Sequence, residues 1–89
     1  MKNRENAINN YVNTIDNAME YIRDAKPANA DNVSAALYQY DIALGYFKPF
    51  ISEELLTNLV DKYLDICEYY KFDITLFSAF NEAYCEAQI

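Results

Sequence analysis

Residues 4–25 read RENAINNYVNTIDNAMEYIRDA, and the spacing of their apolar side chains indicates a long amphipathic helix. Apolar side chains recur there at alternating intervals of four and three residues: Ile8, Val12, Ile15, Met19 and Ile22. This spacing puts them on one side of a helix, where they can pack against the rest of the chain. Pro27 ends the segment, because proline disfavours helical geometry at the preceding residue, Lys26.

A second helix is predicted on the same grounds. Its apolar side chains repeat the intervals of the first segment: Val33, Leu37, Tyr40, Leu44 and Phe47. Asp31 or Asn32 is expected to cap its N-terminus, because short polar side chains can accept hydrogen bonds from the free N–H groups of the first turn. Pro49 is expected to end it.

A third and a fourth helix complete the chain. Ser52 is expected to cap the third, with the carboxylates of Glu53 and Glu54 near the positive end of its dipole. The third helix carries a longer apolar stripe: Leu56, Leu59, Val60, Tyr63, Cys67 and Tyr70. Asp73 is expected to cap the fourth helix. Its apolar side is shorter: Leu76, Phe80, Tyr84 and Ala87.

These four segments predict an all-α fold, a compact bundle of four antiparallel helices. Short connections favour antiparallel neighbours. The sequence has no Asn-Gly or Asp-Gly hairpin turn, so a β-structure competes poorly. With 89 residues the chain is short for two cores, and residues 1–89 are expected to form a single helical domain.

The composition excludes several classes of chemistry. The chain holds 14 acidic and 7 basic residues, a net charge of −7, and it has no His, no Trp and one Gly. A Gly-rich phosphate loop, a histidine-based triad and a histidine zinc site are therefore absent from the sequence, and so is the calcium-loop pattern. We expect no enzymatic activity, no cofactor and no metal. The acidity argues against direct contact with nucleic acid or an anionic membrane.

The sequence also favours a cytoplasmic protein. The first residues lack the pattern of a signal peptide, and no apolar run has the length of a membrane span. Cys67 and Cys85 are then expected to remain thiols. A helical hairpin turning near residues 71–73 would in any case hold them about 12 Å apart, too far for a disulfide.

The acidity is concentrated in the second half of the chain. Residues 1–48 hold six acids and five bases, whereas residues 49–89 hold eight acids and two bases. On the third helix Asp61, Asp65 and Glu68 form a row opposite the apolar stripe, with Tyr69 beside it. The first helix carries a second row: Asp16, Glu20 and Asp24. Such rows have two interpretations, a solvated face that keeps the protein soluble or a strip that presents negative charge to a basic partner.

The second helix has a second apolar face. Tyr38, Ile42 and Tyr46 lie opposite its core stripe at intervals of four. A helix that is apolar nearly all round is either central in its domain or covered by a partner. Tyrosine is a common anchor at interfaces, because it buries a large area and keeps a polar tip.

Two functions compete on these grounds. The first is a small acidic binding protein that inhibits a protein partner by occupying its basic, nucleic-acid-binding surface. Phage-encoded anti-defence proteins, among them anti-CRISPR proteins and DNA mimics, are comparable in size, charge and lack of catalytic groups, a likeness of composition alone. Such a protein would act in the cytoplasm of a bacterium or of a phage host. The alternative is a helical adaptor or regulatory module, possible as a homodimer, that docks through Tyr38, Ile42 and Tyr46.

Overall fold

The computed structural model describes residues 2–87 of the chain, and the side chains of residues 6–86. It contains four α-helices: α1 (Lys2–Ala25), α2 (Ala30–Phe47), α3 (Glu53–Tyr70) and α4 (Ser78–Ala87). Two short 3-10 helices, η1 (Lys48–Phe50) and η2 (Ile74–Leu76), precede α3 and α4. The described part has no strand, and the prediction of an all-α fold with four helices and short connections is confirmed.

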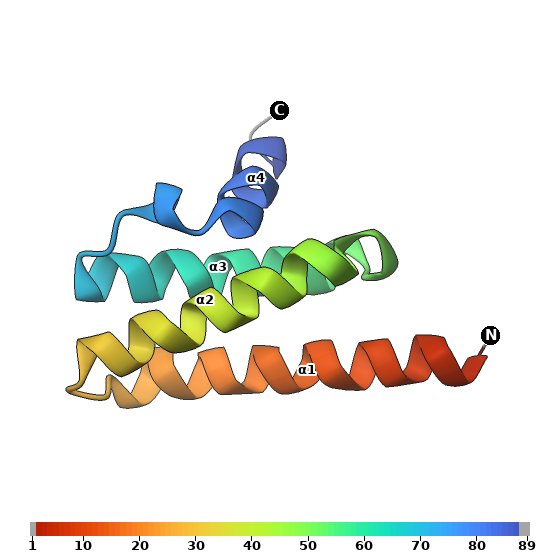
Figure 1. Cartoon of the computed structure of the whole chain (residues 1–89), viewed down its shortest axis with the longest axis horizontal. Helices are drawn as coiled ribbons and strands as arrows, with labels where there is room; N and C mark the ends of the chain where they lie inside the picture. Colours follow the sequence, from red (N-terminus) through yellow and green to blue (C-terminus); the bar gives the residue numbers. More distant parts are fainter. Residues whose placement is uncertain (1, 88–89) are drawn as a thin grey trace.

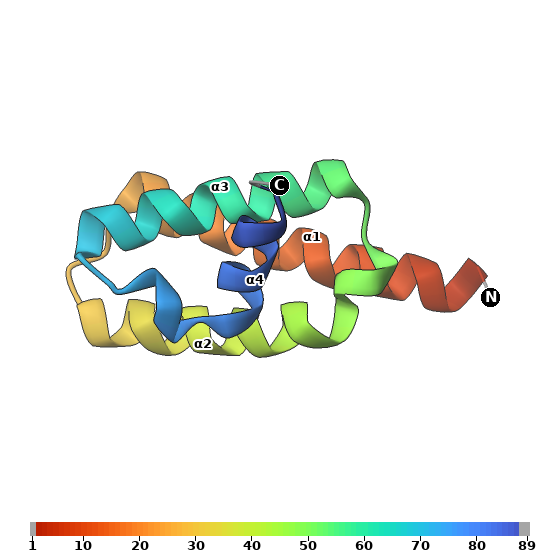
Figure 2. The same ribbon diagram turned by 90° about the horizontal axis from the view of Figure 1, so that it is seen from above.

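The helices are arranged in three layers. α1, α2 and α3 run along the molecule in alternating directions, with α1 beneath the other two in the view of Figure 1. α4 is shorter, lies on the opposite side of α2 and α3 from α1, and crosses them (Figure 2). α1 packs mainly against α3 and also against α2, and α4 packs against the same two helices. The end of α4 points away from the other helices (Figure 1).

The caps of α2 and α3 test two sequence predictions. The prediction for α3 is confirmed, because the Leu55 amide donates to Ser52 Oγ at 3.1 Å. The prediction of Asp31 or Asn32 for α2 is wrong. Asn29 is the cap, and its side-chain oxygen accepts from the Asn32 amide at 3.1 Å. α2 begins two or three residues earlier than predicted, because Asn29, in an extended conformation, already offers a side-chain acceptor.

The start of α4 differs more from the prediction. Asp73 caps η2 and not α4, and it accepts from the Thr75 amide at 2.9 Å and from the Thr75 hydroxyl at 2.7 Å. These hydrogen bonds hold the pKa of Asp73 below its ordinary value. The 3-10 turn also changes the helical phase. Leu76, predicted in the buried stripe, is 55% exposed, whereas Phe77 is fully buried.

The core lies where the three layers meet. The first-helix stripe is confirmed there, since Val12, Ile15, Met19 and Ile22 are buried. Tyr63 of α3 stacks on Phe80 with ring centroids 4.6 Å apart and meets Phe77 edge-on at 5.8 Å. Its hydroxyl donates to the Ile74 carbonyl, so the polar tip is satisfied. Burial raises the pKa of Tyr63 far above its ordinary value. The largest fully buried side chains are Met19, Leu37, Leu59, Tyr63, Ile66, Cys67, Phe77 and Phe80.

Candidate protein-binding site

The acids of α3 form an exposed row on the outer side of that helix. Asp61, Asp65 and Glu68 are exposed, and none of them forms an ion pair with a described side chain. They lie away from the buried Tyr63 and Ile66 of the same helix. Their spacing puts neighbouring Cβ atoms about 5–6 Å apart along a rigid helix. The row therefore presents several unneutralised carboxylates in a fixed arrangement.

Tyr69 lies at the end of this row, where α3 meets α1. It is 53% exposed, and Lys26 Nζ lies 5.5 Å from the centroid of its ring, a cation–π contact. Asp65 and Tyr69 line a depression of about 300 Å³ between the two helices, together with Arg23 and Lys26 of the α1 side. The row is thus bordered by the cations Arg23 and Lys26 on the α1 side.

The predicted row on α1 is in a different state, because each of its three acids, Asp16, Glu20 and Asp24, forms an ion pair. Asp16 Oδ1 lies 2.7 Å from Lys62 Nζ of α3, and both side chains are mostly covered. Arg23 forms ion pairs with both Glu20 and Asp24. Its Nη2 lies 3.6 Å from Glu20 Oε1, and its Nε lies 3.0 Å from Asp24 Oδ1. The hydrogen bond from Arg23 lowers the pKa of Asp24, and the same bond raises the pKa of Arg23. The predicted second row therefore joins α1 to α3 and compensates Arg23, and it has less free charge than the row on α3.

The predicted apolar face of α2 is exposed. Tyr38, Ile42 and Tyr46 are 41%, 56% and 74% exposed, and only Tyr38 has an aromatic neighbour, Phe77, with ring centroids 4.6 Å apart. α2 is also central, because it packs against both α1 and α4. A central position thus does not cover this face. That a partner or a second copy covers it stays a prediction.

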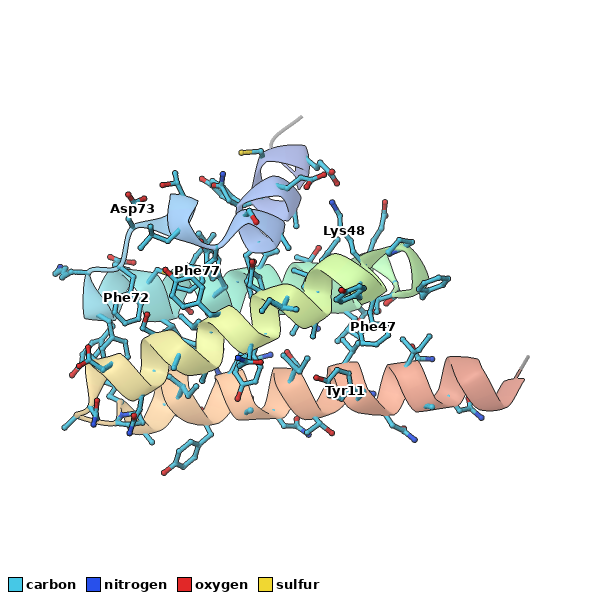
Figure 3. The ribbon with its side chains drawn as sticks, in the orientation of Figure 1. Tyr11, Phe47, Lys48, Phe72, Asp73 and Phe77 are labelled. Atoms are coloured by element: carbon cyan, nitrogen blue, oxygen red, sulfur yellow. The ribbon has the colours of Figure 1, made fainter. Side chains whose placement is uncertain are left out.

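The C-terminal end of α2 is tied to the layers on both sides. Phe47 meets Tyr11 of α1 edge-on, with ring centroids 5.5 Å apart (Figure 3). Lys48 reaches the opposite layer, where its Nζ lies 2.8 Å from a Glu86 carboxylate oxygen and 3.8 Å from one of Glu82. The acids near the end of α4 are therefore partly neutralised from within the molecule.

A groove between α3 and α4 was not among the sequence predictions. It has a volume of about 400 Å³. Residues of both helices line it: Glu53, Leu56, Thr57, Val60, Asp61, Leu64, Ala83, Tyr84 and Glu86. Leu56, Val60 and Tyr84 were predicted as members of the apolar stripes, and the sequence carries no signal that part of those stripes borders an open groove. The groove depends on the direction of α4, which no local pattern specifies.

Asp41 is a second feature whose role the sequence did not indicate. It is the one buried charged residue among the described side chains, at 8% exposure. Its Oδ1 accepts a hydrogen bond from the Phe80 amide at 2.9 Å, so a side chain of α2 caps the first turn of α4. The sequence shows Asp41 only as a polar interruption of an apolar helix. Its role is structural.

The remaining reactive groups do not assemble into a centre. Cys67 is buried and Cys85 is exposed, and both are free thiols. Burial raises the pKa of Cys67 to about 11, which keeps its thiol protonated. Among the side chains that the structure describes, residues 6–86, no group of three or more potential ligands is placed to hold a metal. None of the described helices combines the length and the apolar character that a membrane crossing requires.

Comparison of the chain with family models, with curated proteins and with solved structures finds no significant match. The structure separates the two predicted acidic rows, one free and one paired, and it adds a groove next to the free one. Asp61 belongs to both the row and the groove.

Proposed function

We propose that this protein is a binding protein that inhibits a partner by occupying its basic, nucleic-acid-binding surface. The observation that carries this proposal is the state of the α3 acids. Asp61, Asp65 and Glu68 remain exposed and without an ion pair among the described side chains, although the three acids of the predicted α1 row are paired. Like charges at this spacing repel one another and cost the fold a few tenths of a kcal/mol per pair. A basic partner would relieve that repulsion.

The physical basis of binding would be the one by which such a partner holds nucleic acid. Arg and Lys side chains form strong, charge-assisted hydrogen bonds with carboxylates as they do with phosphates. A row carried by a helix is already ordered, so binding costs little conformational entropy. The net charge of −7 would also speed the encounter with a basic surface. Such a protein would act in the cytoplasm of a bacterium or of a phage host, as anti-CRISPR proteins and other phage-encoded DNA mimics do.

The proposal includes no enzymatic activity. Catalytic acids and bases usually lie in a cleft, where burial and neighbouring charges shift their pKa values. The one buried carboxylate among the described residues, Asp41, is occupied as the cap of α4. The acids of α3 lie on an outer helix surface.

The test begins with capture of a partner from bacterial lysate and its identification by mass spectrometry. Titration calorimetry then compares two variants with the same change of net charge, Asp65→Lys/Glu68→Lys on α3 and Glu20→Lys/Asp24→Lys on α1. Exposed substitutions of this kind usually change stability by about half a kcal/mol each, so both variants should stay folded. We expect the α3 variant to lose binding at low and at high salt, and the α1 variant to keep most of it.

Nucleic acid provides the second arm of the test. The captured partner should release DNA or RNA when this protein is added, because both ligands would compete for one basic surface. Binding should also weaken steeply as salt is raised. The proposal would be contradicted if the partner kept its nucleic acid, or if it bound the α3 variant as tightly as the natural protein. The acidic row would then serve only to keep the protein soluble.

A second candidate function is favoured by the exposure of the α2 face. With Ile42 and Tyr46 both more than half exposed, a helical adaptor or a homodimer could be held by apolar contacts there. The two functions differ in their response to salt. Docking through this face would hardly change with ionic strength, whereas occupation of a basic surface would weaken.

A further inference from the structure

The groove between α3 and α4 combines an apolar floor with an acidic rim. Leu56, Val60 and Leu64 form its α3 side at intervals of four, and Ala83 and Tyr84 form its α4 side. Val60 and Ala83 are buried, while the other three remain partly exposed to solvent. The floor is therefore continuous with the core and still accessible from outside.

The groove exists because α4 diverges from α3. α4 has ten residues and crosses α3, and its end points away from the rest of the molecule (Figures 1 and 2). The N-terminal half of α3 thus has α1 on one side and no helix of the described chain lying along its α4 side (Figure 2). A volume of about 400 Å³ lies within the range of binding pockets and can take a few large side chains.

The rim carries an excess of negative charge. Glu53, Asp61 and Glu86 line the groove. Glu86 is paired with Lys48 at 2.8 Å, whereas Glu53 and Asp61 form no ion pair with a described side chain. No basic residue is among the described side chains that line the groove. An occupant that buries apolar side chains here brings its flanks close to uncompensated carboxylates, and Lys or Arg on those flanks would be favoured.

We propose that this groove is a docking site for a short basic amphipathic helix of a partner protein. Two or three large apolar side chains of that helix, one helical turn apart, would contact Leu56, Leu64 and Tyr84, and its Lys or Arg side chains would pair with Glu53 and Asp61. This is the helix-in-groove mode of recognition, in which apolar anchors provide affinity and charge provides orientation. The site is distinct from the acidic row of α3, with which it shares only Asp61.

The test uses a defined probe and measures binding by fluorescence anisotropy. The probe is a labelled peptide of about 14 residues, long enough to form a helix, with Leu at helical spacing and Lys at the other positions. A peptide of the same composition in scrambled order controls for general attraction between opposite charges. We expect the patterned peptide to bind about tenfold more tightly than the scrambled one, because only the patterned peptide can place its Leu side chains on the floor together.

Two variants locate the peptide on the protein. Thr57 is exposed and lines the groove, so Thr57→Trp should fill the groove without disturbing the core. Asn58 is the next residue and is also exposed, but it lines a different depression near α1. We expect Thr57→Trp to weaken binding about tenfold and Asn58→Trp to leave it within about twofold. Glu53→Gln should weaken binding less and reduce its salt dependence.

Three results would overturn this site. The first is equal affinity of the protein for the patterned and the scrambled peptide. The second is an equal loss of peptide binding in the Thr57→Trp and Asn58→Trp variants. The third is self-association of the protein that Thr57→Trp abolishes but that the peptide does not inhibit. The last result would show a second copy in the groove. Because the assay uses a defined peptide and changes no residue of the α3 row, its failure would leave the proposal for the row intact. Failure of the row variants would likewise leave the groove in place.

Discussion

The carboxylate of Asp41 fixes the start of α4, and its removal should destabilise the protein. Asp41 is 8% exposed, and its Oδ1 lies 2.9 Å from the amide nitrogen of Phe80. Since α4 begins at Ser78, this amide is one of the first N–H groups of the helix and has no acceptor within it. The carboxylate also lies at the positive end of the α4 dipole.

The magnitude follows from these contacts. Loss of a capping side chain costs about 0.5–2 kcal/mol, and the upper end applies here because the orphaned amide is buried away from water. We expect Asp41→Ala to lower the free energy of unfolding by about 2 kcal/mol, which for a chain of this size lowers Tm by about 10 °C. Asp41→Asn keeps an acceptor oxygen and loses the interaction of the charge with the dipole, about 0.5 kcal/mol.

Urea and thermal unfolding followed by far-UV circular dichroism measure these differences. Asn29→Ala and Ser52→Ala are the matched controls, because both remove caps at solvent-exposed helix starts. They should cost about 1 kcal/mol or less each. If Asp41→Ala costs no more than these controls, the capping role of Asp41 is refuted. If Asp41→Asn costs as much as Asp41→Ala, charge and not hydrogen bonding holds α4.

Three further outcomes are expected. Ile42→Lys should leave the protein folded, because this side chain is 56% exposed, and any dimer seen by sedimentation should become a monomer; unfolding of the variant would show that the face is internal. Cys85 should react with a thiol reagent near neutral pH and Cys67 only after unfolding, since Cys67 is buried and its pKa is raised to about 11; rapid reaction of both thiols would contradict the burial of Cys67. The lowered pKa of Asp73 should stabilise the fold above about pH 4, the ordinary value for Asp, and this contribution should be lost as the pH falls through the lowered pKa. Asp73→Asn should therefore flatten the acid limb of a stability-against-pH curve, and an unchanged limb would rule out this contribution.

Much of the fold could be predicted from local patterns. The intervals of Ile15, Met19 and Ile22 placed a buried stripe on α1, and all three are buried. Ser52 could be identified as a cap because a hydroxyl followed by two carboxylates is a local signal. The start of α4 could not be predicted, because Asp73 and Thr75 form a 3-10 turn that shifts the helical phase and brings Phe77 into the core in place of Leu76.

The candidate surfaces were predictable only in part. The helical repeat alone predicted that Asp61, Asp65 and Glu68 lie on the outer side of α3. It also predicted a second face of α2 with Tyr38, Ile42 and Tyr46. All six side chains are exposed in the structure. The sequence could not tell which acids would be neutralised. Glu20 and Asp24 pair with their neighbour Arg23, but Asp16 pairs with Lys62, which is 46 residues away in the chain.

Sequence by itself determined which segments are helices, which side of each helix is apolar and where the charge is concentrated, because these are properties of spacing within one segment. Tertiary structure decided the rest. Lys62 neutralises Asp16, and Asp41 caps α4, because packing brings residues of different helices into register. The crossing of α4 likewise opens the groove beside Val60 and Tyr84. Register and crossing direction are set by how whole side-chain surfaces fit together, so no repeat within a single helix encodes them.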